Sequence, residues 1–363
     1  NEILEMEEQD LNTIVPSEAK IIDEVEFKDY GQKNKINPIE IVGNNDFDDN
    51  MRQFVHGGLD LKETKWSNYP SVVKIRIMNK EGNKWISAGS GVFVGSKSIL
   101  SAGHVFRNND GTWKIKPGDK IYYTFDSSSE NDGWDIPTTG VEYSVTVPEN
   151  INEILPDLTT NEKGETEYSA VIKDIAMLKV PTPIQLLYKG ADFAEIGGME
   201  TLKVGDTTSI VGYPAPDSRE KKERILKQPI RGVLYESSGK VKGITDGDRK
   251  LYPTDVPGGV ARWIDSWTTK SHQWSHLYLN QDTSGGSSGA GVFNSEGKVI
   301  GVLTGSVGEY GQFDWNMATM LNKNLIKNIE KFSDKTIGWY EYKGNRYFFD
   351  ENQRLVKNQK KLI

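Results

Sequence analysis

Short apolar runs alternate with turn residues through the central part of the chain. The runs are rich in β-branched and aromatic residues, and Gly, Asn and Pro separate them. Many such runs, without alternation between strand and helix patterns, predict an all-β antiparallel sandwich or pair of barrels and not an α/β sheet. The predicted strands cover about 71–77, 91–94, 120–125, 141–147, 175–180, 207–211, 291–293 and 299–303.

One helical pattern follows the last of these runs. Leu321, Leu325, Ile326 and Ile329 recur at helical spacing, which predicts a helix over about 317–332. Two polar stretches, 126–170 and 215–275, predict long surface loops. We expect each to contain a hairpin of its own, because structureless loops of that length are uncommon unless they have a function.

The two ends of the chain differ from this body. Residues 1–40 carry eleven acidic and four basic side chains, which is most of the chain's net charge of −8. We expect an acidic, loosely docked leader there. Residues 338–350 hold six aromatic side chains among Gly, Lys and Asn, which predicts a small hairpin that presents rings to a ligand or partner.

Composition excludes several classes of function. The chain has no cysteine, so it has neither disulfides nor thiolate metal sites. No apolar stretch approaches the roughly 18–20 residues that cross a bilayer, and the near-neutral body argues against nucleic acid as a partner. His272 and His276 are four residues apart, but no Glu follows His272 as a zinc-protease helix requires. We therefore expect no metal and no other cofactor.

Three segments carry candidate chemistry, in the order His, Asp, Ser. The loop Gly-Gly-Ser-Ser-Gly-Ala-Gly at 285–291 can turn tightly and expose two backbone amides beside the hydroxyl of Ser288. His104 follows a predicted strand, within Leu-Ser-Ala-Gly-His. Asp174 directly precedes another strand, where a carboxylate is costly unless it is paired. Taken singly, these segments are also compatible with a linker, a core histidine and a turn or cap residue.

Serine-catalysed amide hydrolysis needs a nucleophile, a base beside it, a carboxylate that orients the base, and amide donors for the oxyanion. The segments at 102–104, 174–176 and 285–289, with Val-Gly-Tyr-Pro at 211–214 and the terminal helix, resemble the trypsin-like serine proteases. Within that class they resemble the bacterial glutamyl endopeptidases and the related exfoliative toxins, over roughly 41–332. The resemblance implies a secreted serine endopeptidase with two chymotrypsin-like, six-stranded antiparallel β-barrels and a C-terminal helix.

The resemblance also implies a role for each site residue. Ser288 attacks the scissile carbonyl, His104 takes and returns the proton, and Asp174 fixes the tautomer of the imidazole. The N–H groups of Gly286 and Ser288 form the oxyanion hole. The natural partners are protein or peptide substrates.

The same resemblance divides the chain into a leader at 1–40, a protease domain at 41–333 with barrels that meet near 185–200, and a tail at 334–363. Ile41-Val42-Gly43 resembles the new terminus of activated trypsin-like enzymes, so we expect leader removal to leave Ile41 first, near the specificity pocket. Animal trypsins bind the new amine with an Asp directly before the nucleophile. Ser287 stands there, so activation cannot use that ion pair. A first residue Asn1 fits a secreted chain whose targeting peptide has been removed, although an expressed fragment begins in the same way.

Specificity stays open between basic side chains and Glu. Asp282, six residues before Ser288, stands where trypsin keeps the carboxylate that binds Lys or Arg. Some glutamyl endopeptidases also have Asp there, with a histidine where this chain has Leu303. An acidic pocket floor without a positive counterweight favours a cation, and a capping role for Asp282 is a third reading. The residues expected to bind substrate are Asp282, Thr283, Leu303, Thr304 and Ile41.

The tail resembles the cell-wall-binding repeats of Gram-positive surface proteins. Trp339, Gly344 and residues 347–350 match their Gly-Trp…Gly…Tyr-Tyr-Phe-Asp pattern, whereas Gln353 replaces the usual Gly. The resemblance implies cell-wall carbohydrate or choline as a ligand of 338–350, and a secreted or wall-associated protein of a Gram-positive bacterium. Packing of these rings on the protease body is the structural alternative. A catalytically weak adhesin or toxin-type binding protein on a protease scaffold is the alternative function, and the complete triad argues against it.

Overall fold

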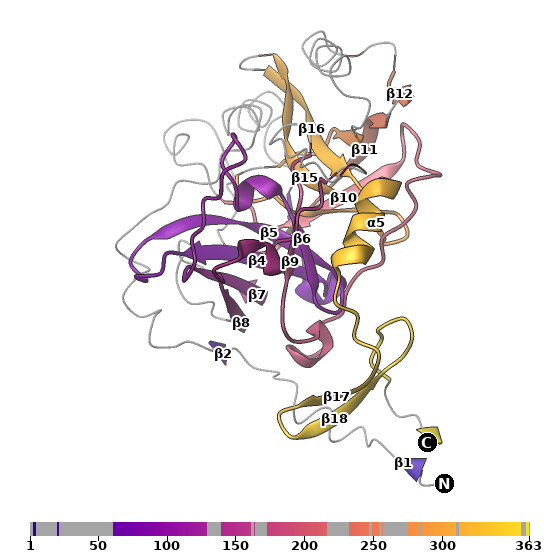
Figure 1. The fold of residues 1–363 in the computed structure, drawn as a ribbon. Helices are drawn as coiled ribbons and strands as arrows, with labels where there is room; N and C mark the ends of the chain where they lie inside the picture. Colours follow the sequence, from indigo (N-terminus) through magenta and orange to yellow (C-terminus); the bar gives the residue numbers. More distant parts are fainter. Residues whose placement is uncertain are drawn as a thin grey trace.

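Two antiparallel β-sheets form the body of the protein, and a helix and a hairpin follow them near the C-terminus (Figure 1). In this computed structural model the described residues are 61–128, 139–160, 173–215, 232–246, 249–253, 275–283, 285–309 and 312–356. Residues 163 and 256 and the short strands at 3–4, 20–21 and 361–362 are also described.

The first sheet has the strand order β2-β8-β7-β4-β5-β6-β9. All neighbours pair antiparallel except β2, a strand of the leader that runs parallel to β8. The bounds are β2 (Lys20–Ile21), β4 (Val72–Met78), β5 (Trp85–Gly95), β6 (Ser98–Ser101), β7 (Lys120–Ser128), β8 (Thr139–Thr146) and β9 (Ala176–Lys179).

The second sheet closes on itself. Its order is β10-β14-β15-β16-β13-β11, and β10 also pairs with β11, which makes a closed barrel of six strands. The bounds are β10 (Thr207–Gly212), β11 (Tyr235–Asp246), β13 (Ser275–Leu279), β14 (Gly291–Asn294), β15 (Val299–Glu309) and β16 (Gln312–Met320). β3 (Lys62–Glu63) and β12 (Arg249–Leu251) join β11 outside this ring. The predicted all-β, chymotrypsin-like double barrel with a C-terminal helix is confirmed.

The helix begins later than the sequence predicts. It is α5 (Lys323–Phe332), and its N-cap Asn322 accepts a hydrogen bond from the backbone N–H of Leu325. The predicted start at 317 is wrong, because residues up to Met320 extend β16 and pair with β13 and β15. Four short 3₁₀ helices complete the described elements: η1 (Trp66–Asn68), η2 (Gly103–Val105), η3 (Ile151–Glu153) and η4 (Ile184–Leu186).

Both stretches predicted as loops with their own hairpins contain strands. The first includes β8, which forms a hairpin with β7, and the second includes β11 and β12, which pair with each other. β11 is also a long strand of the closed barrel, so much of this segment belongs to the body of the protein. Parts of both stretches, including 164–172, 216–231 and 257–274, lie outside the described residues.

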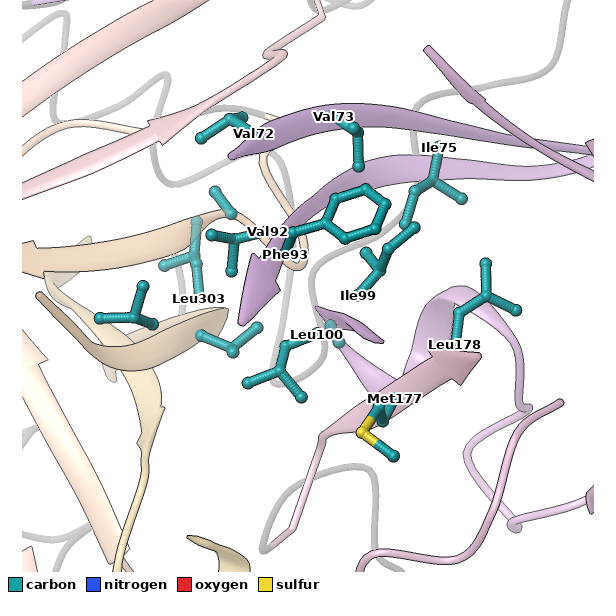
Figure 2. Close-up of a cluster of buried hydrophobic side chains, with 14 of the residues drawn as sticks. Val72, Val73, Ile75, Val92, Phe93, Ile99, Leu100, Met177, Leu178 and Leu303 are labelled. Atoms are coloured by element: carbon teal, nitrogen blue, oxygen red, sulfur yellow. The ribbon is translucent and has the colours of Figure 1, made fainter. Parts of the chain in front are cut away.

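One apolar core runs through both sheets. Phe93 and Leu100 of the first sheet and Leu303 of the second are fully buried members of the same cluster (Figure 2). A core shared in this way fixes the two sheets against each other, because displacement of one would expose apolar surface on both. Loops carried by the two sheets therefore keep a constant relative position.

A buried ion pair lies in the first sheet. Arg76 of β4 and Glu142 of β8 are each 1% exposed and are joined through Arg76 Nη2 and Glu142 Oε2. The hydroxyl of Thr124 donates to the same carboxylate oxygen at 2.5 Å, and the guanidinium lies 4.8 Å from the centre of the Trp85 ring. The pair is thus held by two neighbours, one on β7 and one on β5.

We expect Arg76→Met to lower the free energy of unfolding by about 3–5 kcal/mol, because it leaves a carboxylate buried without its cation. Urea unfolding of the variant and of the wild-type protein measures the loss. The matched control is Arg346→Met, which breaks an exposed pair with Glu341 and should cost no more than about 1 kcal/mol. A loss below about 1 kcal/mol for Arg76→Met would contradict the prediction.

The tail forms the predicted hairpin, from β17 (Gly338–Tyr342) and β18 (Asn345–Phe349). Lys343 and Gly344 connect the strands with φ of 49° and 78°, the positive pair that a two-residue hairpin turn requires. One face packs on the body of the protein, where Tyr347 and Phe349 are buried against Leu186. Beyond the hairpin, β19 (Lys361–Leu362) pairs with β1 (Ile3–Leu4) at the other end of the chain.

Gln353 explains how the tail is attached. It has a φ of 60°, a conformation that glycine adopts more easily. Its side-chain oxygen accepts hydrogen bonds from Ser96 Oγ (2.9 Å) and from the N–H of Thr336 (3.2 Å). Its carbonyl accepts one from Gln185 Nε2 (3.0 Å). A glycine would suit the backbone better but would lose the side-chain contacts with the body.

Candidate active site

Strand pairing in the first sheet brings His104 and Asp174 together. His104 lies in η2 directly after β6, and Asp174 lies two residues before β9, which pairs with β6. His104 Nδ1 and Asp174 Oδ2 are 2.5 Å apart, and the backbone N–H of His104 donates to Asp174 Oδ1 at 2.7 Å. The exposed fractions are 2% for His104 and zero for Asp174. Two contacts to one buried carboxylate fix the imidazole in one orientation.

The second barrel supports the same carboxylate. The hydroxyl of Thr304, on β15, donates to Asp174 Oδ2 at 2.5 Å, and that of Thr319, on β16, donates to the Asp174 carbonyl at 3.4 Å. Thr304 is expected from the sequence to line the substrate pocket, and in the structure its hydroxyl contacts Asp174, the acid of the candidate triad. Neither hydroxyl contact was predicted, because both depend on how the two barrels pack.

Ser288 reaches the same place from the second barrel. Its carbonyl accepts a hydrogen bond from the N–H of Ser90, on β5 of the first sheet, at 2.8 Å. A β-carbon at Gly89 would lie 2.8 Å from that carbonyl and 2.9 Å from Val105 Cγ2, so Gly89 lets the nucleophile loop approach the residue after His104. The loop containing Ser288 thus packs directly on the strands that carry the histidine.

The side chains of His104 and Ser288 are not hydrogen-bonded to each other. His104 Nε2 and Ser288 Oγ are both buried, and neither has a hydrogen-bond partner among the described residues. The expected bond of about 2.6–3.5 Å between them is therefore not made in this structure. Catalytic hydrogen bonds in substrate-free enzymes often tighten only when substrate binds.

The expected pocket residues separate into different environments. Asp282 is partly exposed, whereas Leu303 is fully buried in the core shared by the sheets (Figure 2). The side chain of Leu303 packs among apolar neighbours, and its expected role in substrate binding stays a prediction. Thr283 is buried, and its hydroxyl donates to Asn316 Oδ1 at 2.7 Å. Ile41 lies outside the described residues.

Asn316 was missed by sequence reasoning. This fully buried residue of β16 accepts from Thr283 and donates through Nδ2 to the carbonyl of Gln281. It thereby connects to both neighbours of Asp282. A single Asn in a strand gives no signal in sequence, and only the pairing of β16 places it beside this loop.

A separate cavity of about 860 Å³ lies away from the triad residues. Its lining includes Trp66, Asp126 and Tyr188, and no residue of the candidate triad. The hydroxyl of Tyr188 donates to Asp126 Oδ2 at 3.0 Å, and burial raises the pKa of Tyr188 to about 12. The tyrosine therefore stays protonated near neutral pH, and the geometry gives this cavity no part in the triad chemistry.

Among the described residues, no group of three or more His, Cys, Asp or Glu side chains could hold a metal ion. None of the helices in the described part of the chain is long and apolar enough to span a membrane.

Comparisons with known proteins agree with the geometry. Residues 89–302 match the model of the trypsin-like peptidase domain. No curated protein matches the sequence. Among solved structures, a Glu endopeptidase in complex with MPD shares 18% identity at a TM-score of 0.45, covering 76% of this chain and 97% of that one. An inactivated protease paralogue of the scabies mite shares 12% identity at a TM-score of 0.49, covering 77% of this chain and 98% of that one. A thermostable serine protease of an extremophilic microorganism shares 14% identity at a TM-score of 0.43, covering 72% of this chain and 96% of that one.

Proposed function

Because the chain belongs to the trypsin-like peptidase family and is a serine peptidase, we propose that it is a secreted endopeptidase whose triad is Ser288, His104 and Asp174. The observation that carries the proposal is the buried His104–Asp174 pair, with its contact of 2.5 Å, beside a nucleophile loop that packs on the histidine's own sheet. Burying a polar pair such as His104 and Asp174 costs solvation free energy. A catalytic role accounts for this cost, because perturbed buried pairs gather at functional sites.

The proposed mechanism follows from these contacts. Asp174 accepts a hydrogen bond from the Nδ1–H of His104. This keeps the imidazole proton on Nδ1 and leaves Nε2 able to take the proton of Ser288 as its Oγ attacks the scissile carbonyl. The N–H groups of Gly286 and Ser288 stabilise the oxyanion. His104 then protonates the leaving amine, which leaves an acyl-enzyme on Ser288. A water, deprotonated by His104, attacks that ester, and the proton returns to Ser288 as the acid product leaves.

For specificity, the proposal retains two candidates: cleavage after Lys or Arg, and cleavage after Glu. Asp282 is the residue that separates them, since a pocket carboxylate attracts a cation and repels a carboxylate. Leu303→His, the other substitution that the family resemblance suggests, is not a clean test, because it would place an imidazole in the shared core.

We expect Asp282→Asn to lower cleavage after Lys and Arg at least tenfold if the pocket binds a cation, because the substrate loses its partner in a desolvated site. If the pocket binds Glu, the same change leaves cleavage unchanged or raises it. A peptide-library cleavage profile of the wild-type protein and the variant measures both rates. The control is Asp192→Asn, a partly exposed acid paired with Arg354. A change in the Glu-to-Lys ratio below about twofold, roughly 0.4 kcal/mol, would show that Asp282 does not set specificity.

The bond at which residues 1–40 are removed provides a second test of whether the enzyme cleaves after Glu or after Lys. If the enzyme matures itself, a Glu-selective site cuts at Glu40-Ile41 and a Lys-selective site at Lys35-Ile36. These residues lie outside the described part of the chain. N-terminal sequencing of active protein identifies the bond, and a first residue before 36 or after 52 would contradict removal of this leader.

The outward face of the tail supports a proposal about location. Trp339 and Phe348 face each other across the hairpin with ring centres 5.1 Å apart, and Arg346 stacks on Trp339 at 4.7 Å. These rings are partly exposed, whereas Tyr347 and Phe349 on the opposite face are buried. We propose that this partly exposed pair binds cell-wall carbohydrate or choline, which would hold a secreted protein of a Gram-positive bacterium at the wall.

A further inference from the structure

The oxyanion hole depends on the direction of peptide groups in the nucleophile loop. Its donors, the N–H groups of Gly286 and Ser288, must point at the substrate oxygen and not into the protein. In animal trypsins an ion pair with the residue before the nucleophile stabilises this loop. Ser287 occupies that place here, so other contacts must hold the loop.

Two contacts orient the peptide groups on either side of Gly286. The N–H of Ala215 donates to the Gly285 carbonyl at 2.5 Å, and the hydroxyl of Ser90 donates to the Gly286 carbonyl at 3.0 Å. In a trans peptide the N–H points opposite to the C=O. Anchoring the Gly285 carbonyl on Ala215 therefore turns the Gly286 N–H away from the protein, and anchoring the Gly286 carbonyl prevents rotation of the next peptide.

Ser90 makes contacts on both sides of the loop. Its hydroxyl also accepts from the N–H of Tyr213 at 2.8 Å, and its backbone N–H donates to the Ser288 carbonyl at 2.8 Å. Its own carbonyl accepts from Ser101 Oγ at 2.7 Å, which fixes β5 at this point. The residue has zero exposure, so water does not compete for these bonds. One hydroxyl thus has both a defined donor and a defined acceptor.

Two glycines leave the space in which the Ser90 hydroxyl contacts the nucleophile loop. Gly286 has a φ of 87°, and a β-carbon there would lie 2.7 Å from the Tyr213 carbonyl. A β-carbon at Gly212 would lie 2.8 Å from Ser90 Oγ. Both glycines therefore let the Ser90 hydroxyl and the loop reach each other.

We infer that Ser90 is a positioning residue for the oxyanion hole: its hydroxyl anchors the Gly286 carbonyl, and so fixes the Gly286–Ser287 peptide that joins the two donor peptide groups, in a loop that an activation ion pair stabilises in animal trypsins. This inference rests on the proposed function, since it concerns the same reaction at Ser288. Ser90 itself does not touch the substrate. Its effect is on the transition state, where negative charge develops on the substrate oxygen.

The test is Ser90→Ala in the full chain, with Ser98→Ala as the matched control. Ser98 is equally buried, and its hydroxyl bonds to Ser333 Oγ at 3.1 Å, on contacts separate from the nucleophile loop. The first readout is the rate at which a fluorophosphonate phosphonylates Ser288 with loss of fluoride, a reaction that needs no knowledge of specificity. The second is kcat and KM for a peptide substrate that the wild-type protein cleaves.

We expect Ser90→Ala to lower the labelling rate and kcat by roughly 10- to 100-fold, somewhat less than removal of an oxyanion donor itself, with KM within about twofold. Ser98→Ala should lower thermal stability to a similar extent but label at the wild-type rate. A wild-type rate for Ser90→Ala, or equal slowing by Ser98→Ala, would overturn the inference. If the folded wild-type protein does not label at all, the proposed function fails instead.

Discussion

Replacing Ser288 by Ala will lower kcat by about 10⁶-fold, because the nucleophile is lost and only binding and the oxyanion hole remain. The fold will be unaffected: Ser288 Oγ has no hydrogen-bond partner among the described residues, so its removal leaves no group unpaired there. Turnover of a peptide amide and urea unfolding of the same preparation measure the two effects. We expect the free energy of unfolding to change by less than about 1 kcal/mol.

The neighbouring serine provides the control for this variant. Ser287 is also buried, and the mechanism gives its hydroxyl no role, so Ser287→Ala should keep most of the turnover. If Ser288→Ala kept more than about 1% of the wild-type kcat, another nucleophile would have to be sought.

Asp174→Asn should lower kcat by about 10⁴-fold near neutral pH. The carboxylate now accepts from His104 Nδ1, from the His104 backbone N–H and from the hydroxyl of Thr304. An amide offers only one acceptor oxygen, and its NH₂ group would face the imidazole as a donor. The ring would then present a proton at Nε2, where the attacking serine needs a base.

Steady-state kinetics on the variant measure this effect, with Asp192→Asn as the control for loss of a partly exposed carboxylate. We expect that control to retain wild-type turnover, since Asp192 pairs with Arg354 beneath the tail. A loss of less than about tenfold in Asp174→Asn would mean that Asp174 does not orient the base.

The fold could be predicted where apolar periodicity is strong. The runs that became β4, β5, β7 and β9 are rich in β-branched residues, and each is a strand in the structure. β11 was harder, because its apolar residues such as Val241 and Ile244 are spaced among Ser, Gly and Lys, and its core contacts come from other strands. The helix was predicted to begin too early because Met317 and Met320 continue the apolar pattern of the helix toward the N-terminus. In the structure both residues belong to β16 and pair with neighbouring strands.

The site shows the same division. His104, Asp174 and the 285–291 loop could be predicted from the sequence, because serine-catalysed hydrolysis requires these residue types and each lies in a recognisable local motif. Thr304, Asn316 and Ser90 were not, since each matters only through a contact with a segment far away in sequence. For Leu303, the resemblance gives a position along a strand but not the side chain's surroundings, which are apolar.

Fluorophosphonate labelling of the folded chain, followed by peptide mapping, tests the central claim most directly. The probe reacts only with a serine that has an assembled base and oxyanion hole beside it. We predict a single adduct on the peptide that contains Ser288, and its loss in His104→Ala although that variant keeps its nucleophile. A folded protein with no adduct, or with an adduct on another residue, would contradict the proposed triad and would favour a binding protein on a protease scaffold.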